Sequence, residues 1–181
     1  MSYLINSYRY ASPASEELWE VPYVSTVQIG LNGSSWRGFC LQTTGTTPFL
    51  GKTLTKLTLN LFSFDSGSAS ETFSVGRFDT SGTYSSPLGT LSGTVNNNNQ
   101  LTGVSATYEF TGNAGVISSG DGIGIMIDRS DGVSINLVQV ITSTSNMPTG
   151  CSGTNYSQTS TQWNADSYSN DKAPTGQGYG Y

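Results

Sequence analysis

Three aspartates in the second half of the chain have the chemistry of a calcium site: Asp121, Asp128 and Asp131. Asp121 and Asp128 flank a predicted strand, and Asp131 begins the dipeptide Asp131-Gly132, which is typical of a hairpin turn. Carboxylates in a turn, together with backbone carbonyls, are oxygen ligands that Ca²⁺ prefers. One structural calcium ion is therefore a hypothesis, and we expect no other cofactor. The alternative is that these aspartates only cap turns.

Catalytic chemistry has few candidate residues, because the chain contains no histidine. Histidine is the most frequent general base and the usual partner of a nucleophilic serine or cysteine. A glycoside hydrolase needs two carboxylates that face each other across a cleft, but the spacing of Glu71, Glu109 and Asp128 pairs none of them. We expect that the protein is not an enzyme and has no catalytic residues.

The two cysteines, Cys40 and Cys151, have two interpretations. They can form one disulfide that closes a loop of roughly 110 residues, a pairing that would stabilise the fold through chain entropy. They can also remain two separate thiols, because no secretion signal points to an oxidising compartment. Neither thiol has a histidine to activate it, so a catalytic cysteine is not expected.

Aromatic residues among Asn and Gln suggest a surface for sugars. Trp36, Tyr156 and Trp163, with Tyr168 further on, could form a flat platform, because aromatic faces suit ligands rich in C–H groups. The alternative is that Trp36 and Trp163 fill the core or a contact between subunits.

The elements that must position these residues are short strands. Apolar residues alternate with polar ones, most clearly at Leu57, Leu59 and Leu61, which is the period of a half-buried strand. Further strands are expected at 24–31, 36–42, 71–79, 107–111, 123–127, 133–140 and near 162–166, separated by clusters of Gly, Ser, Asn and Pro. Only Ala14–Glu20 is a candidate for a helix, of one or two turns. This pattern predicts an all-β protein, an antiparallel jelly roll or β-sandwich.

The two ends of the chain are unusually rich in aromatic residues. We expect an N-terminal arm at 1–23, a jelly-roll domain at 24–166 and a C-terminal arm rich in Gly and Tyr at 167–181. Rings on arms would expose apolar area that a monomer avoids, so we expect the arms to make assembly contacts. The residues concerned are Tyr3, Tyr8, Tyr10, Trp19, Tyr23, Tyr168, Tyr179 and Tyr181.

Composition excludes several classes of protein. The chain has 181 residues, 22 of them Gly, and a formal net charge of −5 with only seven Lys and Arg. Scattered basic residues argue against nucleic acid as a partner. No apolar run approaches the roughly 20 residues that a membrane-spanning helix needs, so we expect no membrane span. The first residues do not have the pattern of a secretory signal, which favours a protein made in a cytoplasm.

Residues 36 to about 166 resemble the jelly-roll module of the choice-of-anchor R type. The resemblance rests on segments whose apolar pattern and turns match, namely Trp36-Arg37-Gly38-Phe39, the stretches 54–61, 73–78 and 85–89, Tyr108-Glu109-Phe110, the stretch 116–121 and Trp163. The N-terminal stretch 3–10 is similar to the start of bacteriophage structural proteins. These resemblances imply a structural protein of a virion or of an extracellular assembly, and they imply no catalytic set.

The sequence thus predicts a non-enzymatic structural protein that assembles with itself or decorates a larger assembly. A virion component is the expected setting: a capsid decoration or minor capsid protein, a fibre or a tail protein. Its expected partners are copies of itself, other structural proteins and glycans, and its expected location is the virion after synthesis in the host cytoplasm. The alternatives are a carbohydrate-binding module and an extracellular filament or surface-layer subunit.

Overall fold

In a computed structural model, the chain is a β protein. The structure describes residues 13–22, 27–30, 37–63, 72–81, 87–93, 105–128, 138–143, 146–157, 162–163 and 172–181. Within these ranges there are thirteen strands and no helix. In chain order they are β1 (Glu16–Val21), β2 (Val27–Gly30), β3 (Arg37–Thr43), β4 (Leu54–Ser63), β5 (Thr72–Asp79), β6 (Pro87–Ser92), β7 (Ser105–Gly112), β8 (Asp121–Asp128), β9 (Val138–Ser143), β10 (Cys151–Ser157), β11 (Gln162–Trp163), β12 (Ala173–Pro174) and β13 (Gly176–Gly180).

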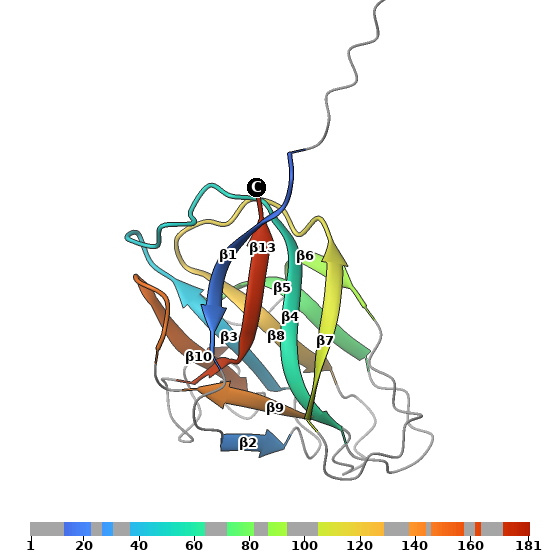
Figure 1. Cartoon of the computed structure of the whole chain (residues 1–181). Coiled ribbons are helices and arrows are strands. Elements are labelled where there is room, and N and C mark those ends of the chain that lie inside the picture. Colours follow the sequence, from blue (N-terminus) through green and yellow to red (C-terminus); the bar gives the residue numbers. More distant parts are fainter. Residues whose placement is uncertain are drawn as a thin grey trace, which may run out of the picture.

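The strands form one antiparallel sheet that curls strongly into a half-barrel (Figure 1). Neighbours follow the order β1-β13-β4-β7-β6-β5-β8-β3-β10-β11, and β9 pairs with β2, β12 and β4. Many neighbours are therefore distant in sequence, as where β4 pairs with β7 and β5 with β8. The prediction of an all-β antiparallel protein is confirmed.

Strand β4 shows how the sequence forms the core. Leu57, Leu59 and Leu61 alternate along it and are all buried, whereas at the alternate positions Lys56 and Asn60 are partly exposed and Thr58 is 9% exposed. One face of this strand is thus apolar and the other polar, as a period of two requires. The inward side chains join a single cluster with residues of the other strands, among them Trp19, Phe39, Leu41, Val75, Leu91, Phe110, Ile123 and Ile125.

Strand β8 is buried on both of its faces. Ile123 and Ile125 belong to the main cluster, and Met126, which follows in the alternate position, is also 1% exposed. The strand lies between β3 and β5, with Cys40, Gly124 and Gly76 opposite one another in register. A Cβ atom on Gly124 would overlap the carbonyl oxygen of Phe39, so the backbones approach too closely for any side chain here.

The described ends of the chain are strands of the sheet. The helix predicted at Ala14–Glu20 is wrong, because β1 occupies most of this segment and pairs with β13, which in turn pairs with β4. Trp19 explains the difference: it is 6% exposed, stacks on Phe49 with ring centroids 4.5 Å apart, and covers Gly178. Burial of this indole favours the extended strand over the short helix that local propensity suggests.

The described residues contain no helix that is long and apolar enough to cross a membrane.

Candidate functional site

The aspartates predicted to bind calcium lie apart. Asp121 and Asp128 begin and end β8, so about 23 Å separates them at 3.3 Å per residue. One ion cannot bind both. Asp131 lies outside the described residues, and no cluster of three or more metal-ligating side chains occurs among the described ones.

Asp121 instead belongs to a buried ion pair. Its Oδ2 atom accepts a hydrogen bond of 2.9 Å from Arg77 Nε and one of 2.8 Å from the backbone N–H of Ser118. Arg77 also donates from Nη1 to the carbonyl oxygen of Ala114. Both side chains are about nine-tenths buried. The carboxylate therefore joins β5, β8 and the segment after β7, and calcium binding by Asp128 and Asp131 stays a prediction.

The two cysteines do not form a disulfide in this structure, where both are free. On the paired strands β3 and β10, Cys40 lies opposite Thr154 and Cys151 lies opposite Thr43. The two positions are thus three residues apart along the ladder, about 10 Å, beyond the Cα separation of a disulfide.

Burial also keeps both thiols in the protonated form. It raises the pKa of the Cys40 thiol well above its usual value. Partial burial raises the pKa of the Cys151 thiol, which a hydrogen bond with Thr47 lowers to a smaller extent. Because the thiolate is the reactive form, these shifts make both thiols less reactive.

The residues predicted for a sugar platform are brought together only in part. Strands β10 and β11 place Tyr156 and Trp163 directly opposite each other in the ladder. Trp36 and Tyr168 lie outside the described residues. The platform therefore stays a prediction.

Of the aromatic residues predicted to make assembly contacts, three are described. Trp19 is a core residue, and Tyr179 is half-buried with Lys56 Nζ 4.0 Å from its ring centroid. Tyr181 is 38% exposed. The remaining ones lie outside the described residues, namely Tyr3, Tyr8, Tyr10, Tyr23 and Tyr168.

Two residues with exposed apolar side chains, Val116 and Tyr181, lie near one end of the sheet, where both contact Thr53. Besides Tyr181, the large exposed hydrophobic residues of the described part are Leu88 and Val116, each 51% exposed. Val116 forms an isolated bridge with Thr53, and Tyr181 exchanges two backbone hydrogen bonds with the same residue. Leu88 precedes Gly89, which lies against the backbone of Ala114.

The N-terminal segment enters the sheet at this same end. Glu16 at the start of β1 forms a 2.6 Å ion pair with Lys52, and Ser15 hydrogen-bonds Thr55. Figure 1 shows the C-terminus and the start of β1 at one end of the molecule.

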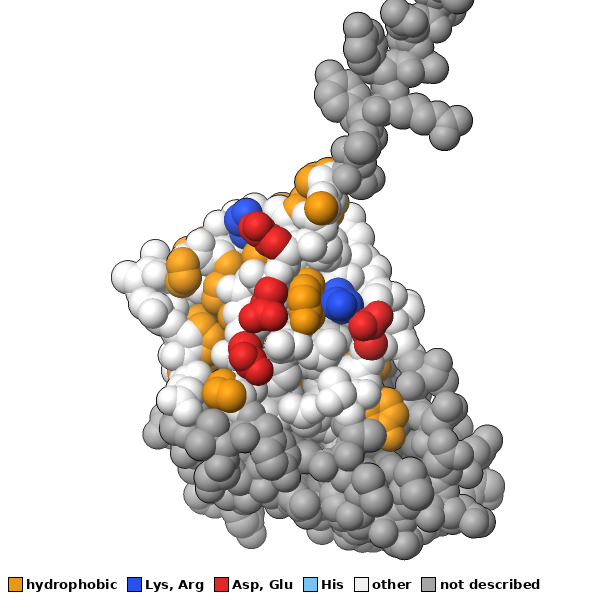
Figure 2. Space-filling model, viewed as in Figure 1, with side chains coloured by type: hydrophobic (Ala, Val, Ile, Leu, Met, Phe, Trp, Pro, Cys, Tyr) orange, Lys and Arg blue, Asp and Glu red, His pale blue; other side chains and the backbone are white. Residues whose placement is uncertain are grey.

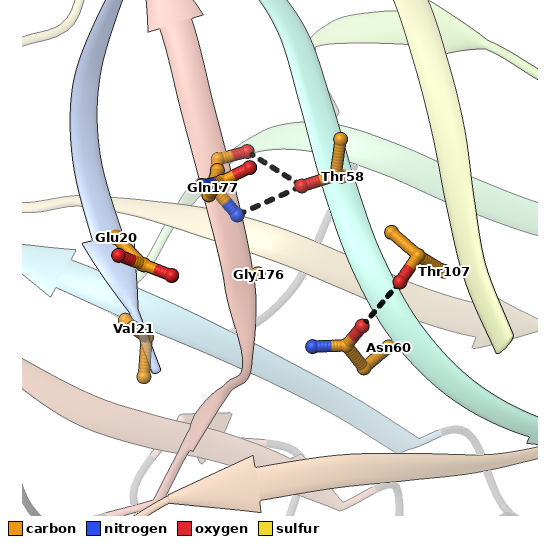
Figure 3. A pocket seen from close by; sticks show the side chains of 7 residues that line it. All are labelled: Glu20, Val21, Thr58, Asn60, Thr107, Gly176 and Gln177. Carbon is orange, nitrogen blue, oxygen red and sulfur yellow. Dashed lines mark hydrogen bonds between the residues drawn. The ribbon is translucent and has the colours of Figure 1, made fainter. Parts of the chain in front are cut away.

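The outer face of β1, β13, β4 and β7 is polar and contains a hollow. Charged side chains gather on this face (Figure 2), where Lys56 lies 3.4 Å from Glu109. The hollow has a volume of about 180 Å³. Figure 3 shows its lining, which comes from four strands: Glu20, Val21, Thr58, Asn60, Thr107, Gly176 and Gln177.

Sequence reasoning missed this hollow for a physical reason. The alternation in β4 already placed Thr58 and Asn60 on a polar face, but nothing local showed which strands lie beside it. Strand β13 is rich in glycine, a composition that is depleted in strands and typical of turns. Its neighbours β1 and β4 are far from it in sequence.

No protein-family model, curated protein or solved structure matches this chain. The resemblance to the choice-of-anchor R module therefore remains a prediction from the sequence.

Proposed function

We propose that this protein is a non-enzymatic structural protein that assembles with copies of itself, as a component of a virion such as a capsid decoration, fibre or tail protein. One observation carries the proposal. The exposed apolar side chains Val116 and Tyr181 both belong to residues that contact Thr53, close to Thr55, which hydrogen-bonds Ser15 where the aromatic segment 1–12 leads into β1. The segment and the apolar surface can therefore take part in the same assembly contact.

The proposed contact is between two copies. The segment 1–12 of one copy carries Tyr3, Leu4, Ile5, Tyr8 and Tyr10, and these side chains would cover the exposed apolar surface of another. Covering such a surface is favourable, because each Å² of apolar surface removed from water contributes about 25 cal/mol to the free energy of association.

We also propose that the curled sheet is of the jelly-roll type. Its support is the number of antiparallel neighbours that are distant in sequence, such as β4 with β7 and β3 with β8. Connections of this kind are typical of Greek-key proteins. An experimental structure of an assembled particle would test both the fold type and the virion setting.

The assembly test removes each side of the proposed contact in turn. One variant lacks residues 2–12, which leaves β1 and Trp19 in place. A second carries Val116→Ser and Tyr181→Ser. The full chain should form oligomers in size-exclusion chromatography with light scattering and particles in negative-stain images. Both variants should be monomeric and keep the β-sheet circular dichroism spectrum.

A matched control is Lys56→Gln, which changes an exposed face away from the contact and should assemble like the full chain. A full chain that is monomeric at high concentration would contradict the proposal. So would variants that assemble as well as the control.

A further inference from the structure

The hollow on the outer face lies where β13 begins beside β4. Strand β13 begins at Gly176, and the residue before it, Thr175, is fully buried and accepts a hydrogen bond from the backbone N–H of Asn60. Gly176 has φ of 150°, and a Cβ atom there would overlap the carbonyl oxygen of Thr58. This close approach of the two backbones thus requires glycine, and an open space lies nearby between Glu20, Asn60 and Gln177 (Figure 3).

The polar groups around this space are held in place by their neighbours. Thr107 Oγ1 donates a 2.7 Å hydrogen bond to Asn60 Oδ1, and Asn60 Nδ2 donates one of 3.1 Å to Thr175 Oγ1. Gln177 Oε1 accepts a 2.8 Å hydrogen bond from the hydroxyl of Tyr179. These contacts fix which atom of each amide is the donor. A site whose groups are already oriented loses less entropy when a ligand binds.

Several hydrogen-bonding groups in the hollow remain available to a ligand. Each amide nitrogen carries two hydrogens, and the described residues use one on Asn60 Nδ2 and one on Gln177 Nε2. Glu20 is exposed, and its carboxylate has no hydrogen bond or ion pair with any residue that the structure describes. The hollow therefore offers two N–H donors beside a carboxylate acceptor.

This combination suits a ligand with hydroxyl groups. A hydroxyl donates one hydrogen bond and accepts two, so it can use an amide and a carboxylate together. An anion would meet Glu20 and the nearby Glu17, and both lysines of this face are already paired with Glu16 and Glu109. A cation would find the carboxylates of Glu20 and Glu17 but would also meet the two N–H donors. The chemistry favours a neutral, polyhydroxylated ligand.

We propose that the hollow binds one monosaccharide unit of a neutral glycan through hydrogen bonds from Asn60 and Gln177 and to Glu20. A hollow of about 180 Å³ is smaller than the roughly 300–1,000 Å³ pockets of drug-sized ligands, which limits the ligand to a single sugar ring. Lys56 already covers a face of the Tyr179 ring, so affinity comes from hydrogen bonds rather than stacking. The site is separate from the apolar assembly surface and does not depend on it.

The test uses the full chain and saturation-transfer difference NMR, which works for large assemblies as well as for monomers. The probes are the methyl glycosides of glucose, galactose and mannose and free N-acetylglucosamine, titrated to about 100 mM because a few hydrogen bonds give millimolar affinity. At least one of them should give a saturable signal. Glucuronic acid and glucosamine serve as the anionic and cationic counterparts and should bind more weakly.

Two variants test whether the saturation-transfer signal comes from a sugar bound in the hollow. Asn60→Ala removes an amide donor and Glu20→Gln removes the charged acceptor, and each should weaken binding about tenfold, the effect of one hydrogen bond to a ligand. The matched control is Glu16→Gln, which removes a carboxylate from the same strand outside the hollow and should leave affinity unchanged.

The absence of a saturable signal with every neutral sugar would overturn the proposal. Binding restricted to the charged sugars would also overturn it, as would equal affinity in Asn60→Ala, Glu20→Gln and the control. None of these outcomes bears on assembly, which is measured by particle size.

Discussion

Strands β4 and β8 look alike in sequence but lie in different surroundings. Both alternate apolar residues, Leu57, Leu59 and Leu61 in one and Ile123 and Ile125 in the other. In β4 the intervening positions carry polar side chains, of which Lys56 and Asn60 are partly exposed, whereas in β8 the intervening Gly124 and Met126 are buried. A period of two therefore identifies the strand but does not show whether its second face is covered.

This difference separates two kinds of region in the molecule. The region around β8 uses its polar groups to hold the fold together, as in the buried pair of Arg77 and Asp121. The outer face around β4 carries polar groups that are exposed and available to ligands, such as Glu20 and Asn60. Substitutions in the first region should affect stability, and substitutions in the second should affect binding.

The largest expected effect is that of Asp121→Ala. Removing one partner of a buried ion pair leaves the other charge without compensation, which lowers the free energy of unfolding by about 3–5 kcal/mol. Here the guanidinium of Arg77 and the backbone N–H of Ser118 would both lose their acceptor. Urea unfolding monitored by circular dichroism measures the change.

The matched control for this variant is Asp79→Ala. Asp79 lies opposite Asp121 in the ladder but is exposed, and its hydrogen bonds with Ser81 lower the pKa of its carboxyl group. Its loss should cost at most about 1 kcal/mol. Equal costs for the two variants would show that the Arg77 pair contributes no more than a surface turn.

A smaller effect is expected for Gly124→Ala in the buried region. The added Cβ would overlap the backbone of Phe39, so β3 and β8 would have to separate, and overpacking of this kind costs about 1–3 kcal/mol. Gly45→Ala is the control, since its Cβ would meet only Ser119 Oγ at 4.0 Å. A melting temperature that falls as little in Gly124→Ala as in the control would contradict the close approach of these strands.

The smallest effect is expected for Lys56→Gln on the outer face. Its ion pair with Glu109 is solvent-exposed, and such pairs contribute less than about 1 kcal/mol. The contact with the Tyr179 ring adds a similarly small amount. Thermal unfolding should be almost unchanged, and a loss as large as that of Asp121→Ala would remove the distinction between the two regions.

The sequence predicts an element correctly where the local pattern of apolar and polar residues matches the surroundings of that segment in the fold. Strand β4 was expected from its alternating leucines and is present. The segment around Trp19 was expected to be helical, but pairing with β13 made it a strand. Strand β13 could not be expected, because its three glycines carry no apolar pattern and gain their place from Trp19 and β4.

The candidate sites were harder to predict than the fold. Asp121 was identified as a residue with a special task, but its partner Arg77 is 44 positions away and no local pattern joins the two. The hollow combines residues from β1, β4, β7 and β13, so it exists only once the sheet has formed. Its polar side chains have no unusual spacing in the sequence.

Because β1 pairs with β13, Trp19 cannot reach its native surroundings until almost the whole chain has been translated. Trp19 is translated about 160 residues before Gly178, the residue that it covers, and at 5–20 residues per second this interval lasts roughly 8–30 s. Throughout that time the indole of Trp19 lacks Gly178, the residue that it contacts in the folded protein. We therefore expect chaperones that bind exposed apolar segments to recognise the stretch around Trp19 until β13 leaves the exit tunnel.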